Sequence, residues 1–142
     1  MLRGVPAILS PDLLKVMREM GHGDVIVLAD SNFPAASNAK RLIRLDGVGT
    51  VNLLGAMLEF FPLDTFVDDP VSLMQTLPGT PTPPIWKEYE RIIKEKDFKK
   101  AFSDFNMIER MKYYEYAQEA YAIVQTGMAA HYANIGLKKG VI

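Results

Sequence analysis

Cysteine is absent from the 142 residues, which excludes disulfides, thiolate nucleophiles and cysteine-bound metals. A chain of this length buries roughly two-thirds of its unfolded surface, so it needs no cross-links to fold. The absence of cysteine fits a reducing compartment. Residues 1–7 contain no signal-peptide core, and we therefore expect a cytoplasmic protein whose single domain spans residues 1–142.

Long hydrophobic runs are also missing, since a stretch such as Val25–Ala29 is far shorter than the roughly 20 residues that span a bilayer. Charge is nearly balanced, with 16 Lys and Arg against 17 Asp and Glu, whereas nucleic-acid-binding proteins normally carry a basic excess. The small basic clusters, Lys40-Arg41 with Arg44 and Lys138-Lys139, are interpreted as solvated surface. We expect no membrane or nucleic-acid partner, but a small neutral molecule, another copy of the chain, or both.

Histidine is scarce as well. The two histidines, His22 and His131, lack the spacing of metal ligands. The sequence contains no nucleophile elbow of the Gly-x-Ser-x-Gly type, no phosphate-binding loop and no nicotinamide fingerprint. We therefore expect neither a metal nor a cofactor.

What the chain does contain is an alternation of helix and strand patterns. Ser10-Pro11-Asp12 predicts a helix start, and Gly21 predicts its end. The alternation predicts the α/β class, as a three-layer α/β/α domain with a mostly parallel sheet. The segments 31–37 and 78–84 are expected to be loops. The other expected elements are a strand at 25–29, a helix from its cap Thr50 to about 61, a strand at 71–76, a helix at 85–96, a strand at 106–109, a helix containing 113–120, and strands at 122–126 and 135–138.

The first candidate functional region joins His22 to Asp30. His22 stands between Gly21 and Gly23 at a helix end, where a packed core side chain is not expected. An imidazole accepts and donates protons near neutral pH, which suits general acid–base catalysis. Asp30 follows the expected strand at 25–29, at the carboxyl end where α/β proteins place ligand-binding groups. The alternative is purely structural, with His22 satisfying the last helix carbonyls and Asp30 capping a loop.

The second candidate region combines Glu109-Arg110 with Tyr132-Ala133-Asn134. The guanidinium of Arg110 offers a fork of donors for hydroxyl groups, while Tyr and Asn offer mixed donor and acceptor contacts. The structural alternative pairs Arg110 with Glu109 or Glu115 on the surface. The residue types alone leave both interpretations open.

Five short motifs stand in order along the chain, after an opening Leu9-Ser10-Pro11-Asp12-Leu13-Leu14. They are Gly21-His22-Gly23-Asp24, Ala29-Asp30-Ser31-Asn32-Phe33-Pro34, Glu109-Arg110 with Tyr113-Tyr114, Ala122-Ile123-Val124 with Thr126-Gly127, and Tyr132-Ala133-Asn134-Ile135 with Lys138-Lys139-Gly140-Val141. In this order and spacing they resemble the RbsD/FucU family, the D-ribose pyranases and L-fucose mutarotases. The resemblance runs from residue 9 to the end, with a less diagnostic middle.

The resemblance implies an α/β/α fold, a homodecameric ring with sugar sites near subunit contacts, and a role in carbohydrate metabolism. It implies an isomerase that interconverts the anomers of a monosaccharide by acid–base ring opening and closure, without cofactor or metal. By the same resemblance His22 is the proton donor. The implied substrate-binding residues are Asp30, Arg110, Tyr132, Ala133 and Asn134.

Gly23, Phe33-Pro34 and Arg110 resemble the fucose members rather than the ribose members. Two positions depart from the fucose pattern: Met128 stands where an acidic residue is usual, and Ala133 replaces a glycine. The main expectation is therefore an L-fucose mutarotase-like activity. The alternatives are a D-ribose pyranase, a non-catalytic monosaccharide-binding subunit and a purely structural oligomer.

Overall fold

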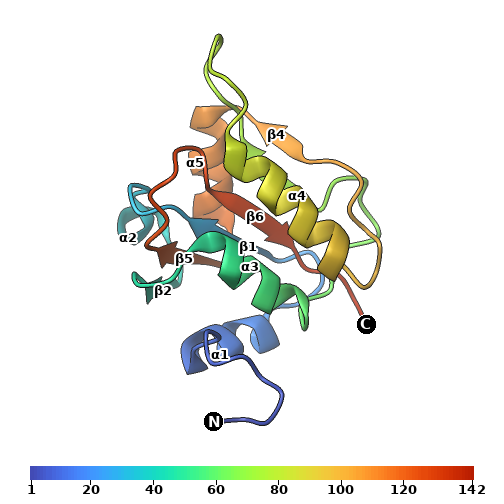
Figure 1. Cartoon of the computed structure of the whole chain (residues 1–142). Coiled ribbons are helices and arrows are strands. Elements are labelled where there is room, and N and C mark those ends of the chain that lie inside the picture. Colours follow the sequence, from blue (N-terminus) through green and yellow to red (C-terminus); the bar gives the residue numbers. More distant parts are fainter.

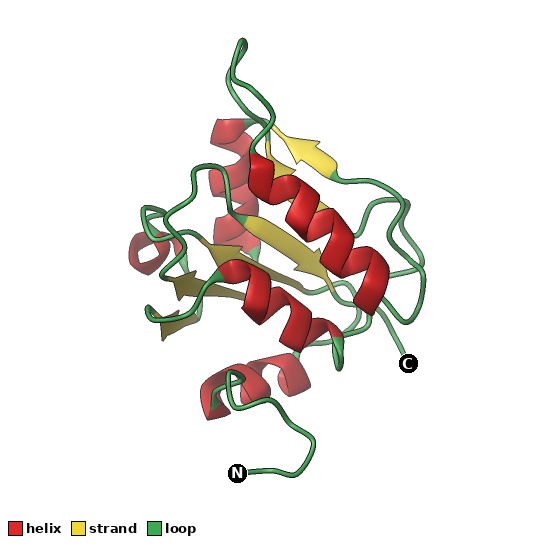
Figure 2. Ribbon diagram, in the orientation of Figure 1, coloured by secondary structure: helices red, strands yellow, loops and turns green.

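The computed structural model describes all 142 residues, Met1–Ile142. Its centre is a six-stranded sheet of order β2-β5-β1-β6-β3-β4, crossed by helices on both faces (Figures 1 and 2). None of the helices has the length and hydrophobicity that crossing a membrane requires. The elements are α1 (Pro11–Glu19), β1 (Val25–Ala29), α2 (Ala35–Asn38), β2 (Leu42–Leu45), α3 (Thr50–Leu58), β3 (Val71–Met74), α4 (Pro84–Lys96), β4 (Asn106–Ile108), α5 (Arg110–Glu119), β5 (Ala122–Thr126) and β6 (Ile135–Lys138).

The three layers follow from the two-residue alternation of side chains along buried strands. In β1, Ile26 and Leu28 point into a core shared with α1, α3 and α4, whereas Val27 and Ala29 point into a second core shared with α2 and α5. All four side chains are fully buried, which explains why β1 reads as a continuous apolar run. The predicted α/β/α class is confirmed.

The sheet is mostly parallel, as predicted. β1 pairs in parallel with β5, β5 with β2, and β3 with β4. β6 lies between β1 and β3 and runs antiparallel to both. The carboxyl ends of the parallel strands and the start of β6 therefore share one end of the sheet, while β6 points toward the C-terminus at the other end (Figure 1).

The first helix begins as predicted, because Ser10 Oγ accepts a hydrogen bond of 3.2 Å from the Leu13 N–H. It also ends as predicted, because Met20 is the C-cap and Gly21 follows it directly. Lys139 Nζ donates to the carbonyls of Met17 and Met20 there. A lysine from a distant part of the chain thus adds a side-chain cap to the predicted helix end.

Two local predictions were wrong, and one strand was missed. Thr50 is the first helical residue of α3 rather than its cap, which is Gly49; the Thr50 hydroxyl lies 2.6 Å from Tyr89 Oη. The segment 31–37, expected to be a loop, contains the start of the short helix α2. The strand β2 was not predicted; Arg44 within it is exposed, as expected of the basic cluster, and only Ile43 of β2 is buried.

Candidate active site

A polar pocket of about 460 Å³ opens at the end of the sheet where the parallel strands terminate, as expected for ligand sites of α/β proteins. Four of the predicted binding residues line it although they lie far apart in the sequence. Asp30 follows β1, Arg110 begins α5, and Tyr132 and Asn134 precede β6. The rest of the lining comprises Asn32, Phe33, Met74, Leu77, Tyr114 and His131.

Asp30 is the buried acid of this pocket, with 6% of its surface exposed. Its Oδ1 accepts hydrogen bonds from the backbone N–H groups of Asn32 and Phe33, at 2.9 and 3.0 Å. Burial raises the pKa of the Asp30 carboxyl above its usual value, although these N–H groups oppose the shift. The Ala133 N–H also acts on the Asp30 carboxyl and opposes the shift. Oδ2 has no backbone contact as short as the two on Oδ1, so it is the Asp30 atom that can accept a hydrogen bond from a ligand.

Asn134 is oriented by the same loop, because its Oδ1 accepts a hydrogen bond of 2.8 Å from the Asp30 N–H. The amide nitrogen of Asn134 is therefore free to donate. Asp30 and Asn134 thus offer an acceptor and a donor side by side. That pair matches a sugar hydroxyl, which accepts and donates at once.

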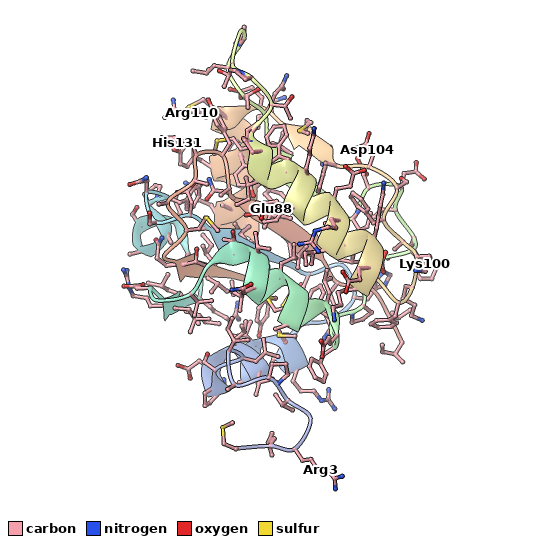
Figure 3. All side chains as sticks on the ribbon, in the orientation of Figure 1. Arg3, Glu88, Lys100, Asp104, Arg110 and His131 are labelled. Atoms are coloured by element: carbon pink, nitrogen blue, oxygen red, sulfur yellow. The ribbon has the colours of Figure 1, made fainter.

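Arg110 brings the positive charge. The Glu109 carboxylate caps α5 by accepting hydrogen bonds from the N–H groups of Met111 and Lys112. Arg110 forms no ion pair within the chain. Its guanidinium instead lies 5.9 Å from the centre of the Tyr114 ring. Figure 3 shows Arg110 and His131 close together, and both line the pocket. The surface ion pair with Glu109 or Glu115 considered above is absent.

Tyr132 adopts a left-handed backbone conformation with φ of 56°, a region that non-glycine residues occupy rarely and often at functional sites. Its carbonyl accepts a 2.8 Å hydrogen bond from the Trp86 indole, and Tyr89 Oη donates to the next carbonyl, that of Ala133. Two side chains of α4 thus fix this turn. Ala133 itself is fully buried and is not part of the pocket lining.

The two departures from the fucose pattern are both packing positions. Ala133 belongs to the larger hydrophobic core, against which Met128 packs half-buried. The Met128 methyl lies 3.5 Å from the point where a Cβ on Gly49 would stand. Neither change alters a side chain that lines the polar pocket.

His22 stands at the opposite end of the sheet. It precedes β1 whereas Asp30 follows it, and the five residues of β1 alone span about 16 Å at roughly 3.3 Å per residue. Its side chain is 45% exposed and lines a second cavity of about 480 Å³ with, among others, Phe60, Val141 and Ile142. His22 is neither buried in packing nor turned away from a cavity, as predicted, but it does not reach the polar pocket of its own chain.

An acidic partner that the sequence analysis missed holds the imidazole. His22 Nε2 lies 3.0 Å from Oδ1 of Asp64, a carboxylate with only 2% of its surface exposed. Burial by itself raises the pKa of Asp64, but the Phe66 N–H and the His22 imidazole outweigh this effect and hold the pKa below its usual value. The Phe66 ring packs against the imidazole with a centroid distance of 5.1 Å.

The end of β6 brings His22 and Asp64 together although 42 residues separate them. On one side of it the Gly23 N–H donates to the Lys139 carbonyl. On the other side the Asp64 N–H donates to Lys138 and the Gly140 N–H donates to Pro62. The C-terminal extension of β6 therefore lies between the His22 turn and the Asp64 segment.

The structure thus defines an α/β protein with a small polar pocket, suited to a hydroxyl-rich ligand, and a separate His–Asp pair suited to proton transfer. No group of three or more His, Asp or Glu residues stands close enough to hold a metal ion. The RbsD / FucU transport protein family matches residues 3–142, and the chain belongs to this family.

Among curated relatives, the human fucose mutarotase is 46% identical over 149 residues, covering 99% of this chain and 94% of the human protein. Among solved structures, the Streptococcus pneumoniae fucose mutarotase in complex with L-fucose superposes with a TM-score of 0.92 at 45% identity, covering 99% of both chains. Bacillus subtilis RbsD in complex with D-ribose shares the fold, with a TM-score of 0.76 at 20% identity.

Proposed function

We propose that this chain is a fucose mutarotase, an isomerase that interconverts the α and β anomers of L-fucose, and that residues 1–142 form one mutarotase domain. The observation that carries the proposal is the polar pocket, in which Asp30, Arg110, Tyr132 and Asn134 converge. Its support is the 45% identity over the full length with a fucose mutarotase solved in complex with L-fucose. The reaction is carried out in the cytoplasm.

In this proposal the pocket holds the sugar by its hydroxyl groups. Asp30 Oδ2 accepts from one hydroxyl, the Asn134 amide and the Arg110 guanidinium donate to others, and Tyr132 contributes its phenol. The left-handed turn at Tyr132 is held by Trp86, so the site is arranged before the sugar binds.

Mutarotation breaks the bond between C1 and the ring oxygen and forms it again on the other face of the C1 carbonyl. The anomeric hydroxyl loses a proton while the ring oxygen gains one, and the electron pair of the broken bond moves to the ring oxygen. His22 transfers a proton at one of these two oxygens. A positioned acid or base accelerates such a step typically about 10²- to 10⁴-fold, which suffices for a reaction that also proceeds without catalyst.

His22 reaches the sugar from a neighbouring copy of the chain. A proton-transfer group must stand within about 2.6–3.2 Å of the reacting atom, and β1 separates His22 from Asp30 within one chain. The His22 cavity is lined by apolar side chains that are exposed in the isolated chain, including Phe60, Val141 and Ile142. Such a surface is typical of a contact between copies, and the homodecameric ring implied by the family is the assembly we propose.

Exchange NMR on the fucose anomers tests the function. We expect the parent to exchange them above the uncatalysed rate and to prefer L-fucose over D-ribose measured in parallel, while His22→Ala exchanges at the background rate. A parent that binds fucose but does not accelerate exchange would show a binding subunit instead.

Subunit mixing tests the shared site. His22→Ala and Asp30→Asn are each expected to be inactive, but unfolding and reassembling them together places intact His22 of one copy beside intact Asp30 of another. Random assembly restores about a quarter of the parent sites. No recovery in a mixture that assembles like the parent by light scattering would contradict a site shared between copies.

A further inference from the structure

The contact between His22 and Asp64 has a chemical consequence beyond the mutarotase assignment. We propose that Asp64 is the positioning residue of the active site: it holds the His22 imidazole in the Nε2–H tautomer, so that Nδ1 is the atom that exchanges a proton with the sugar. The role of Asp64 in catalysis rests on the proposed function, which identifies the reaction. The assignment of the His22 tautomer does not depend on that function.

The geometry specifies which ring nitrogen carries the hydrogen. An ionised carboxylate only accepts hydrogen bonds, so in the 3.0 Å contact between His22 Nε2 and Asp64 Oδ1 the imidazole is the donor. In the neutral ring Nε2 then bears the hydrogen and Nδ1 carries the lone pair. Nδ1 forms no hydrogen bond within the chain, which leaves it available to a substrate proton.

Asp64 itself is fixed from two sides. Its own N–H donates to the Lys138 carbonyl at the end of β6, and its Oδ1 accepts a 3.0 Å hydrogen bond from the Phe66 N–H. Because only 2% of Asp64 is exposed, water does not compete strongly for the carboxylate. Its position relative to the imidazole is therefore set by the backbone.

The exposure of the two partners explains why His22 needs this orientation. The imidazole is 45% exposed and stands between two glycines, which restrict its backbone less than any other residue. Two contacts restrict the ring instead: the carboxylate at its edge and Phe66 at its face. Such a carboxylate–histidine pair fixes both the tautomer and the ring orientation.

The other charged groups near His22 do not replace Asp64 as the partner of the imidazole. Asp24 accepts from the Gly21 N–H, and Lys139 donates to the carbonyls of Met17 and Met20. Arg18 also lines the cavity, but it forms no ion pair with Asp64. Asp64 is the carboxylate that contacts the imidazole.

The first test reads the tautomer directly, by ¹⁵N NMR of the assembled protein with labelled histidine, in which His22→Ala assigns the signals. We expect the parent His22 in its neutral form to show a protonated Nε2 and an unprotonated Nδ1. In Asp64→Ala, which removes the acceptor that contacts Nε2, we expect a mixture of tautomers. A parent with the hydrogen on Nδ1, or with both tautomers, overturns the proposal whether or not the protein acts on fucose.

The second test separates positioning from substrate binding. In Asp64→Asn we expect kcat for fucose to fall about 10- to 100-fold, by analogy with residues that orient metal-binding histidines, with KM changed less than about twofold. Asp46→Asn is the matched control, because Asp46 pairs with Arg44 on the exposed surface, and it should leave both values unchanged. A rise in KM at unchanged kcat would assign Asp64 to substrate binding and overturn the positioning role.

Discussion

Gly140→Ala is the substitution whose effect the structure specifies most closely. A Cβ at this position would stand 2.5 Å from the Leu63 carbonyl oxygen and 2.8 Å from the Asp64 Cα. Both neighbours are backbone atoms, so no side-chain rotation relieves the overlap. The Pro62–Asp64 segment must move away, and the 2.8 Å hydrogen bond from the Gly140 N–H to Pro62 lengthens.

The expected loss of stability combines two effects. Overpacking costs about 1–3 kcal/mol, and a weakened backbone hydrogen bond costs about 1 kcal/mol more. For a chain of 142 residues, a total of about 2–4 kcal/mol corresponds to a Tm lowered by roughly 6–12 °C. Because the displaced segment carries Asp64, we also expect anomer exchange to fall in the molecules that remain folded.

The assay is thermal unfolding followed by circular dichroism, with exchange NMR on the same sample at 20 °C below the measured Tm. Gly47→Ala is the control, because Gly47 is exposed and a Cβ there meets nothing within 4 Å. It should be neutral or stabilising by about 0.4–1 kcal/mol through the unfolded chain. If Gly140→Ala unfolds at the same temperature as Gly47→Ala and keeps full activity, the close contact between Gly140 and Leu63 does not support the site.

Two further predictions concern buried polar groups. Tyr113 Oη is buried without a hydrogen-bond partner, whereas Tyr89 Oη contacts Thr50 and Ala133. In urea titrations we expect Tyr113→Phe to be as stable as the parent or more stable by about 1 kcal/mol, and Tyr89→Phe to be less stable by about 1–3 kcal/mol. Equal effects of the two substitutions would contradict this reasoning. Burial raises the pKa of Asp30, so the folded state binds the proton of this carboxyl more tightly than the unfolded state does. The parent therefore loses stability as pH rises from the ordinary aspartate pKa of about 3.9 through the raised pKa of the folded state. Asp30→Asn has no carboxyl to titrate, so the Tm of the variant minus that of the parent should increase across this pH range and stay at the higher value at pH 7. A Tm difference that decreases as pH rises would show that folding lowers the pKa of Asp30 instead.

Much of the fold is visible in the sequence because the strong patterns are local. Ser10 before the periodic Leu13 and Met17 predicts α1, and the apolar run of β1 predicts a strand covered on both faces. β2 was missed because it is an edge strand: only Ile43 is buried, so it carries no apolar run. Thr50 resembles a helix cap in sequence, and only the packing of Tyr89 shows that its hydroxyl serves the core instead.

The binding pocket was predictable from the residues at strand ends, but the arrangement around His22 was not. His22 and Asp30 are close in sequence, yet the strand between them carries them to opposite ends of the sheet. That separation could have been inferred from the rise per residue of β1. Asp64 gave no such signal, because it lies outside the regular elements and meets His22 only through the end of β6.

The antiparallel course of β6 has a practical consequence for work with this protein. It directs the last residues of the chain to the rim of the His22 cavity, where Val141 and Ile142 form part of the wall. An affinity tag or fluorescent fusion joined after Ile142 would crowd the imidazole and the surface that we expect to face another copy. Handles for purification and labelling therefore belong ahead of Met1, which is fully exposed.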